Sequence, residues 1–338
     1  MTQNRAAVQV LSLRYLSVIL IMSIVAFLSF ILALTLGSVD TSIAEVLKSL
    51  FYDDETFIRR IITEVRLPRV EAGFLVGGML ALAGALMQVL LRNPLAEPYV
   101  LGVSGGAAVF TLLAIIYGLS GIWINASAFT GAFVSIMLVF TLSRAGGDWN
   151  PMRMLLTGVV IAAGWGAVIS FLLAISPASK IHGMLFWLMG DLSFAQHTPA
   201  NFYILLFAVV SCMLAARSMN LLARGELQAA TLGVSVISLR YFIYFMASLL
   251  AATAVMQAGS IGFIGLIVPH LLRLIIGSDH RLLIPASVLL GGSLLVVADA
   301  LARTIIAPQQ LPVGVLTAMI GVPLFLFLMH STAIRQKS

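Results

Sequence analysis

The chain has 338 residues, of which 61% are hydrophobic and only 9% are charged. Soluble domains carry roughly 25% charged residues, so this composition excludes a water-soluble protein. The net charge of +6 does not indicate nucleic acid binding. Most of the cations flank apolar segments, which is the pattern that the positive-inside effect produces in membrane proteins.

Apolar segments recur along the whole chain, each near the length of about 20 residues that a helix needs to cross a bilayer. Backbone groups in lipid must be hydrogen-bonded within their own segment, so helices rather than open strands are expected. The prediction is an all-α polytopic membrane protein, a single transmembrane domain over residues 1–338. The predicted spans are 15–36, 70–91, 99–119, 124–143, 154–176, 200–216, 237–258, 263–277, 283–302 and 311–330.

The distribution of lysine and arginine gives the orientation of these spans. With ten spans, both termini lie on the same side of the membrane. That side carries twelve of the 19 cationic residues and the other side carries seven. The positive-inside rule therefore places both termini in the cytoplasm.

Two polar segments are expected on the outer side. The longer one, 37–69, is expected to contain a short surface helix and ends at Arg66-Leu-Pro-Arg69. The second, 177–199, contains Phe186 and Trp187. Aromatic residues of this kind are typical of a helix that lies at the membrane interface.

Arg66, Arg69 and Arg303 are the candidate functional residues of the outer face. Arg303 follows Asp299 by four residues, so the two are expected to pair on one face of a helix. We place Asp299 as the only acidic residue inside a span. The structural interpretation is that Arg303 neutralises Asp299 while the side chains of the other two arginines extend to the lipid headgroups. The functional alternative is that all three meet acidic side chains of a docking partner. The residues alone favour the first interpretation.

Among the candidate sites, the inner segment 217–236 has the most specific sequence pattern. Gly225 separates two short helical stretches, and Glu226 lies in the first turn of the second, where the helix dipole favours a carboxylate. Gly233 suits the left-handed cap that ends this second stretch. The segment either docks a soluble partner or lies on the inner leaflet, and both alternatives stay open. Four leucines are expected on it: Leu221, Leu222, Leu227 and Leu232.

The second and seventh spans share a weak sequence similarity. Residues 79–88 read MLALAGALMQ, and residues 246–257 read MASLLAATAVMQ. The predicted topology runs these two spans in opposite directions. Inverted repeats are common in transporters, so the similarity is a weak indication of one.

The sequence lacks the motifs of an enzyme or of a metal site. Its histidines show no metal-ligand spacing, and none of its lysines follows a glycine as in the phosphate-binding loop of an ATPase. The chain is therefore expected to hold no cofactor and not to hydrolyse ATP. A stand-alone secondary transporter driven by an ion gradient is the alternative function. It is disfavoured because paired intramembrane carboxylates are missing.

Several stretches together resemble one family, the permease subunits of bacterial binding-protein-dependent ABC importers for iron-siderophores, haem and cobalamin. The resemblance covers essentially the whole chain. The stretches that carry it are Arg66–Arg69, Asn93-Pro-Leu-Ala-Glu-Pro98 with Leu101-Gly-Val-Ser104, Met219–Gly233, Gly259–His270, Asp279-His-Arg281 and Leu311-Pro-Val-Gly-Val315.

The resemblance implies a multi-pass subunit of the bacterial inner membrane that works as a homodimer. Two ATP-binding subunits, which hold ATP and Mg²⁺, would bind on the cytoplasmic side, and a periplasmic binding protein would dock outside. The cargo would be a ferric siderophore, haem or cobalamin, with an oxyanion also open.

The resemblance also assigns roles to residues. Arg66, Arg69 and Arg303 would accept acidic residues of the binding protein. A cytoplasmic gate would lie at Asn150-Pro151-Met152, where this chain departs from the small hydroxyl residues expected in the family. The residues that would couple the chain to the ATPase are Arg224, Gly225, Glu226 and Gly233.

Overall fold

The computed structural model describes residues 2–37, 41–52, 56–144, 150–193, 195 and 198–335. Within these ranges the protein is helical and contains no β-strand. Two of the elements depart from the α-helical form, because η1 is a π-helix and η2 is a 3₁₀ helix. The elements are α1 Thr2–Thr35, α2 Ile43–Phe51, α3 Phe57–Arg60, η1 Ile61–Arg66, α4 Leu67–Leu90, η2 Pro98–Leu101, α5 Val103–Ile116, α6 Ile122–Ser143, α7 Pro151–Ile175, α8 Ala178–Met189, α9 Pro199–Arg224, α10 Glu226–Thr231, α11 Val236–Ala258, α12 Ile264–Ile276, α13 His280–Thr304 and α14 Val313–Arg335.

The polytopic helical fold predicted from the sequence is confirmed. Eight helical stretches of the described chain are long and apolar enough to cross a membrane. The apolar helices α5 and α12 are shorter, with 14 and 13 residues. They occupy the positions of the third and eighth predicted spans. Each of the two follows a stretch of non-helical or 3₁₀ backbone, at 91–102 before α5 and at 259–263 before α12.

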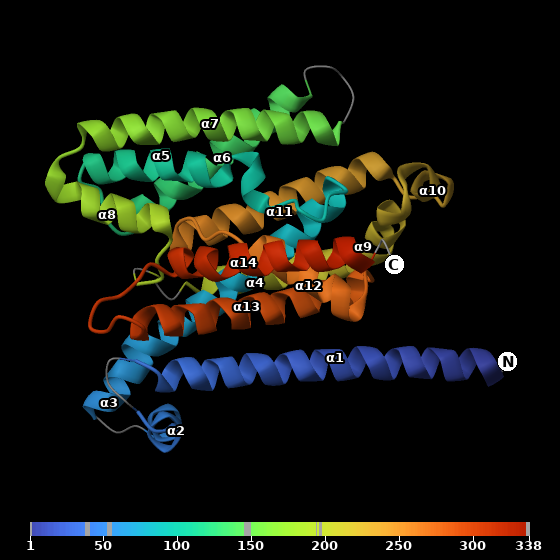
Figure 1. The fold of residues 1–338 in the computed structure, drawn as a ribbon, viewed down its shortest axis with the longest axis horizontal. Coiled ribbons are helices and arrows are strands. Elements are labelled where there is room, and N and C mark those ends of the chain that lie inside the picture. The colour runs from blue at the N-terminus through green and yellow to red at the C-terminus, as the bar shows by residue number, and fades with distance from the viewer. Residues whose placement is uncertain are drawn as a thin grey trace.

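The long helices lie roughly side by side, so the bundle has two distinct ends (Figure 1). The start of α1, the end of α14 and the short helix α10 lie at one end, whereas α2, α3 and α8 lie at the other. This arrangement agrees with the predicted topology, in which both termini share a side with the 217–236 segment.

Several helices extend beyond the predicted spans, among them α1, which begins at Thr2. The second span runs from Phe57 to Leu90, because α3, η1 and α4 form one continuous stretch. The sixth extends to Arg224. Hydropathy marks only the apolar part of a helix, while its backbone hydrogen bonds continue into polar sequence. The structure also corrects the statement that Asp299 is the only acidic residue within a span, because Glu71 lies on α4.

The expected helix of the first outer segment is α2. Ser42 begins it with a capping box: the Ser42 Oγ accepts a hydrogen bond from Glu45 N, and the Glu45 carboxylate accepts one from Ser42 N. This reciprocal arrangement satisfies two backbone donors that the first turn of a helix otherwise leaves unpaired. The second outer segment contains α8, as expected.

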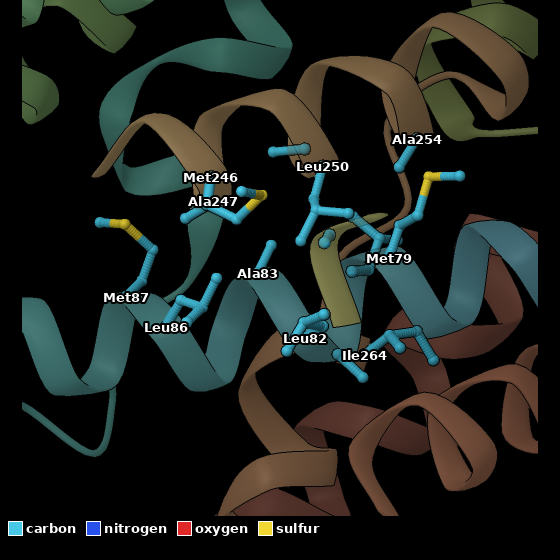
Figure 2. Packing of buried hydrophobic residues seen from close by; sticks show 14 of the residues in the cluster. Met79, Leu82, Ala83, Leu86, Met87, Met246, Ala247, Leu250, Ala254 and Ile264 are labelled. Atoms are coloured by element: carbon cyan, nitrogen blue, oxygen red, sulfur yellow. The ribbon is translucent and has the colours of Figure 1, made fainter. Parts of the chain in front are cut away.

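The core of the bundle is built around α4, which packs against α11, α12 and α13. Figure 2 shows Met87 and Leu86 facing Met246 on α11, with Met79 at the opposite end of the contact beside Ala254. The two helices therefore run antiparallel, and the two similar stretches, 79–88 and 246–257, face each other. The inverted-repeat hypothesis itself stays a prediction.

Glycines allow the core helices to approach at backbone distance. A Cβ atom added to Gly84 of α4 would lie 1.8 Å from the carbonyl oxygen of Gly265 in α12. Helices in lipid gain little from the hydrophobic effect and associate by close packing, for which small residues are needed. Gly84 is thus a position where the fold depends on the absence of a side chain.

Gly84→Ala should therefore destabilise the protein, by about 1–3 kcal/mol or more, because α4 and α12 must separate to admit the methyl group. The matched control is Gly183→Ala in α8, where an added Cβ meets no atom of the described residues within 4 Å. Thermal unfolding of the two purified variants in mild detergent measures the difference. Equal melting temperatures would show that the α4–α12 contact is not tightly packed.

Candidate functional site

The inner segment forms the helix–turn–helix predicted from the sequence. The α9 helix ends at Gly225, which has φ +144° and ψ 144°, and α10 begins at Glu226. Gly233, at φ +82°, follows the end of α10. Its N–H bonds to Ala230 O, and the N–H of Val234 bonds to Ala229 O. This pair of bonds is a Schellman cap, which requires a left-handed residue at the glycine position.

Glu226 ties α10 to two other parts of the bundle. Its Oε1 forms a salt bridge of 3.1 Å with Nη2 of Arg92, in the turn after α4, and a second one with Nη2 of Arg240 on α11. The carboxylate also lies in the first turn of its helix, where the dipole favours it. A single side chain thus connects α10 to α11 and to the turn between α4 and α5.

Only two of the four leucines expected on this segment are strongly exposed. The Leu227 side chain is 80% exposed and Leu232 is 66% exposed, whereas Leu222 is buried in the core. Leu221 and Leu232 line a cavity of about 650 Å³ between α9 and α11. Of the four leucines expected on this segment, Leu222 is turned inward, because α9 continues helically through its position. Arg224 is the exposed last residue of α9.

A polar network anchors the end of α9. Asn220 Nδ2 donates to Asp279 Oδ1 over 2.7 Å, and Tyr15 of α1 donates to the other oxygen of the same carboxylate. Burial alone raises the pKa of Asp279, but these bonds and one from Arg281 N outweigh burial and hold its pKa below the usual value. The network joins the helix before the turn at Gly225 to α1 and to the start of α13.

The two non-helical stretches meet each other inside the bundle, a contact that the sequence analysis missed. Glu97 Oε1 accepts a hydrogen bond of 2.8 Å from Phe263 N, and the Tyr99 hydroxyl accepts one of 3.3 Å from Ile261 N. Burial raises the pKa of Glu97, while the bond from Phe263 acts in the opposite direction. The sequence did offer one indication of this contact: Glu97 is an acidic residue in a turn that is otherwise apolar and contains two prolines, Pro94 and Pro98.

At the outer end, Arg66 is buried and binds the end of α1. Its Nη1 donates to Leu34 O over 2.7 Å, to Thr35 O over 3.3 Å and to Thr41 Oγ1 over 2.8 Å. The last carbonyls of a helix lack intrahelical partners, and a cation is favoured near them. Arg66 therefore caps α1 and fixes the chain that leads to α2.

Arg69 and Arg303 share the carboxylate of Asp299. Arg69 Nη2 lies 2.8 Å from Oδ1, and Arg303 Nε lies 3.1 Å from Oδ2 across the predicted i, i+4 spacing. Arg69 also reaches Gln310 at 3.0 Å and Asp191 at 3.7 Å. The pairing of Arg303 with Asp299 is confirmed. The structure adds Arg69 to this pair, from a helix far away in the sequence.

The predicted gate lies at the beginning of α7. Asn150 is the N-cap residue, and its Oδ1 accepts hydrogen bonds from Met152 N at 2.9 Å and Arg153 N at 3.2 Å. Pro151 occupies the first helical position, where its missing N–H costs nothing. The departure from small hydroxyl residues is thus compatible with capping, because asparagine caps a helix as well as serine does. The Met152 side chain is 64% exposed.

The comparisons with known proteins agree with this architecture. The model of the FecCD transport family matches residues 24–331. This chain belongs to the FecCD transport family.

Individual relatives cover most of the chain. The cobalamin import system permease protein BtuC of Halobacterium salinarum is 40% identical over 278 residues, which are 81% of this chain and 74% of the relative. The hemin transport system permease protein HmuU of Yersinia pestis is 42% identical over 273 residues, 78% of this chain and 81% of the relative. A solved inward-facing structure of a metal-chelate type ABC transporter superposes with a TM-score of 0.81 at 29% identity, covering 94% of this chain and 99% of that one.

This FecCD-family chain is accordingly a permease subunit of an ABC importer. Membership of the family also removes the alternative of a stand-alone carrier driven by an ion gradient. The docking, coupling and gating roles of individual residues stay predictions, since similarity along the chain does not test them.

Because Arg69 and Arg303 share the carboxylate of Asp299, neutralising that one side chain should affect both arginines. Asp299→Asn should destabilise the permease by about 3–5 kcal/mol, because two buried guanidiniums then lose their common counter-charge. Asp191→Asn is the matched control, since Asp191 lies farther from Arg69 and should cost less. Thermal unfolding of both variants in the same detergent tests this. If the two melt alike, the Arg69–Asp299–Arg303 cluster contributes no special stability.

Proposed function

We propose that two copies of this permease form the membrane-spanning path of a metal-chelate importer in the bacterial inner membrane. Two ATP-binding subunits would bind the cytoplasmic end, and a periplasmic binding protein would deliver the cargo to the outer end. ATP and Mg²⁺ would be held by the partner subunits and not by this chain.

The observation that carries this proposal is the α9–Gly225–α10 segment. Leu227 and Leu232 expose apolar surface at the end of the bundle that carries both termini. The Schellman cap and the salt bridges of Glu226 hold that surface in a defined shape. An apolar, rigid projection of this kind suits a cleft in a folded partner better than it suits free solution.

The same contacts suggest how movement of the partner would reach the path. A force on α10 acts through Glu226 on Arg92 and Arg240. Arg240 belongs to α11, which packs against α4 in the core, and Arg92 lies in the turn that leads to α5. We assign the cytoplasmic gate to Asn150, Pro151 and Met152 at the start of α7, a helix that contacts both α5 and η2.

At the outer end, Arg66, Arg69 and Arg303 supply positive charge for docking. Asp191 and Asp299 lie against Arg69 and Arg303. The field of buried charges extends beyond the protein surface and attracts an acidic partner even when the guanidiniums are covered. The docking role thus rests on net charge rather than on direct exposure.

The cargo assignment rests on the relatives, whose names specify cobalamin and hemin, both metal ions held in large organic ligands. We assign to this permease a cargo of the same kind, a ferric siderophore, haem or cobalamin. An oxyanion is the competing cargo.

Purification of the tagged chain from its native membranes in mild detergent tests the assembly. A P-loop ATPase in a one-to-one ratio with the chain is expected, and a pure homo-oligomer without an ATPase would contradict the proposal. Uptake of labelled iron or cobalt chelates by cells with and without the chain tests the cargo. Loss of oxyanion uptake alone would assign the competing cargo.

Glu226→Arg should lower ATP-driven uptake at least about tenfold, because it places a third guanidinium beside Arg92 and Arg240. Adding Arg240→Glu restores one salt bridge and should recover part of the rate. Gln228→Arg on the same short helix is the control, since it adds charge without touching these contacts. Uptake in reconstituted vesicles is the measurement. Full activity of Glu226→Arg would refute the coupling role.

Arg66→Glu should weaken the affinity of the binding protein, and the loss should be larger at low ionic strength, where charges are least screened. Arg60→Glu makes the same charge change at an exposed position of α3 and serves as the control. Binding to the permease complex in nanodiscs over a salt series gives the result. An affinity loss that is independent of salt points to damage of the α1 cap instead of docking.

A further inference from the structure

The cavity of about 650 Å³ between α9 and α11 lies at the end of the bundle that carries both termini. Its position along the chain shows how deep in the membrane it sits. Arg217, in its wall, is the first residue after the predicted span 200–216, and Ser235, also in the wall, stands two residues before the span 237–258. The polar headgroup region flanks the apolar core of a bilayer, so the cavity lies at the level of the headgroups of the inner leaflet.

Part of the cavity wall offers positive charge and hydrogen-bond donors. Arg217 and the hydroxyl of Ser218 form no hydrogen bond or ion pair with another described residue. Ser235 Oγ donates to Ser238 Oγ over 3.0 Å, so the hydroxyl hydrogen of Ser238 is left for another acceptor. None of the described residues that line the cavity is acidic. This part of the wall therefore suits an anion.

The rest of the wall is apolar and continues into the membrane. Leu239 and Phe242 of α11 line the cavity. On the opposite side, Val210, Leu214 and Arg217 recur at intervals of four and three residues, so they share one face of α9. The side chains of Val210 and Leu214 are 51% and 83% exposed. This face carries apolar surface from the interior of the bilayer to a cation at the headgroup level, as a phospholipid does with its chains and its phosphate.

We propose that the cavity binds an anionic phospholipid of the inner leaflet, with phosphatidylglycerol as the simplest example. Its phosphodiester accepts hydrogen bonds from Arg217, Ser218 and Ser238, and its acyl chains lie against Phe242 and Leu214. A zwitterionic lipid brings an ammonium group, for which the described wall has no carboxylate. A soluble phosphate ion leaves the apolar wall uncovered. Charge and apolar length together select the anionic lipid.

Native mass spectrometry of the full chain in mild detergent tests this, with one lipid titrated at a time. Phosphatidylglycerol, phosphatidylethanolamine and phosphatidylcholine with identical acyl chains are compared. One phosphatidylglycerol per chain is expected to bind at least about fivefold more tightly than either zwitterionic lipid, the ratio that one cation at the membrane surface supplies. Equal binding of the three lipids, or no bound lipid, overturns the proposal. Displacement of phosphatidylglycerol by inorganic phosphate at constant ionic strength also overturns it, because the ligand is then a soluble anion.

Arg217→Gln should weaken phosphatidylglycerol binding at least about fivefold and leave phosphatidylcholine binding unchanged, because it removes the charge and keeps most of the side chain. Arg153→Gln is the matched control. It removes another exposed arginine at the same end of the bundle, on α7, that does not line the cavity. Each variant is first checked for a single species on gel filtration. Unchanged phosphatidylglycerol binding by folded Arg217→Gln, or an equal loss in the control, refutes this site.

Leu232 and Gly233 also line the cavity, so the ATP-binding subunits of the proposed importer are the competing occupant. Lipid extracted from the complex purified from native membranes decides between them. Phosphatidylglycerol retained by the complex, and lost on Arg217→Gln, supports the lipid, whereas a complex that retains none overturns it. This last measurement rests on the proposed function. The titration of the chain alone does not, so failure of the lipid site and failure of the importer assembly are distinguishable.

Discussion

Backbone that leaves the helical form within a membrane bundle needs hydrogen-bond partners from protein, since lipid offers none. Here Glu97 and Tyr99 supply these partners to the chain before α12. Their own segment is the equally irregular chain before α5. The non-helical stretch before α12 therefore depends on side chains of the stretch before α5 for two of its backbone hydrogen bonds. The close approach of Gly84 and Gly265 sets the distance between α4 and α12, and the two ends of the bundle are built outward from this centre.

The outer and cytoplasmic ends hold their arginines in a similar way, although the outer group is buried while the side chains of Arg92 and Glu226 are 38% and 40% exposed. At each end one carboxylate serves two arginines: Asp299 serves Arg69 and Arg303, and Glu226 serves Arg92 and Arg240. At the outer end Asp191 approaches Arg69 as well, at 3.7 Å, so this group of arginines is not held by Asp299 alone.

Much of this architecture was predictable from the sequence, because hydropathy alone locates helices that must satisfy their own backbone. The Gly225–Gly233 segment was predictable as well, since helix caps have local signals. Contacts between distant segments were not. Nothing in the spacing of Arg69 or Glu97 identifies Asp299 or Phe263 as a partner, because helix packing decides which faces meet. Arg66 was expected at the surface, yet it caps α1, a role that depends on where α1 ends relative to η1.

The brevity of α10 has a further consequence. With six residues it is far below the length at which a helix is stable in water, because nucleation costs more than so few hydrogen bonds return. It is helical only because its two glycines cap it and Glu226 anchors it. A synthetic peptide with this sequence would be a coil, and it would have to fold on binding before it could compete with the intact protein. The recognition surface is thus a property of the whole bundle. An inhibitor that imitates α10 would need a scaffold that holds its six residues in the helical conformation.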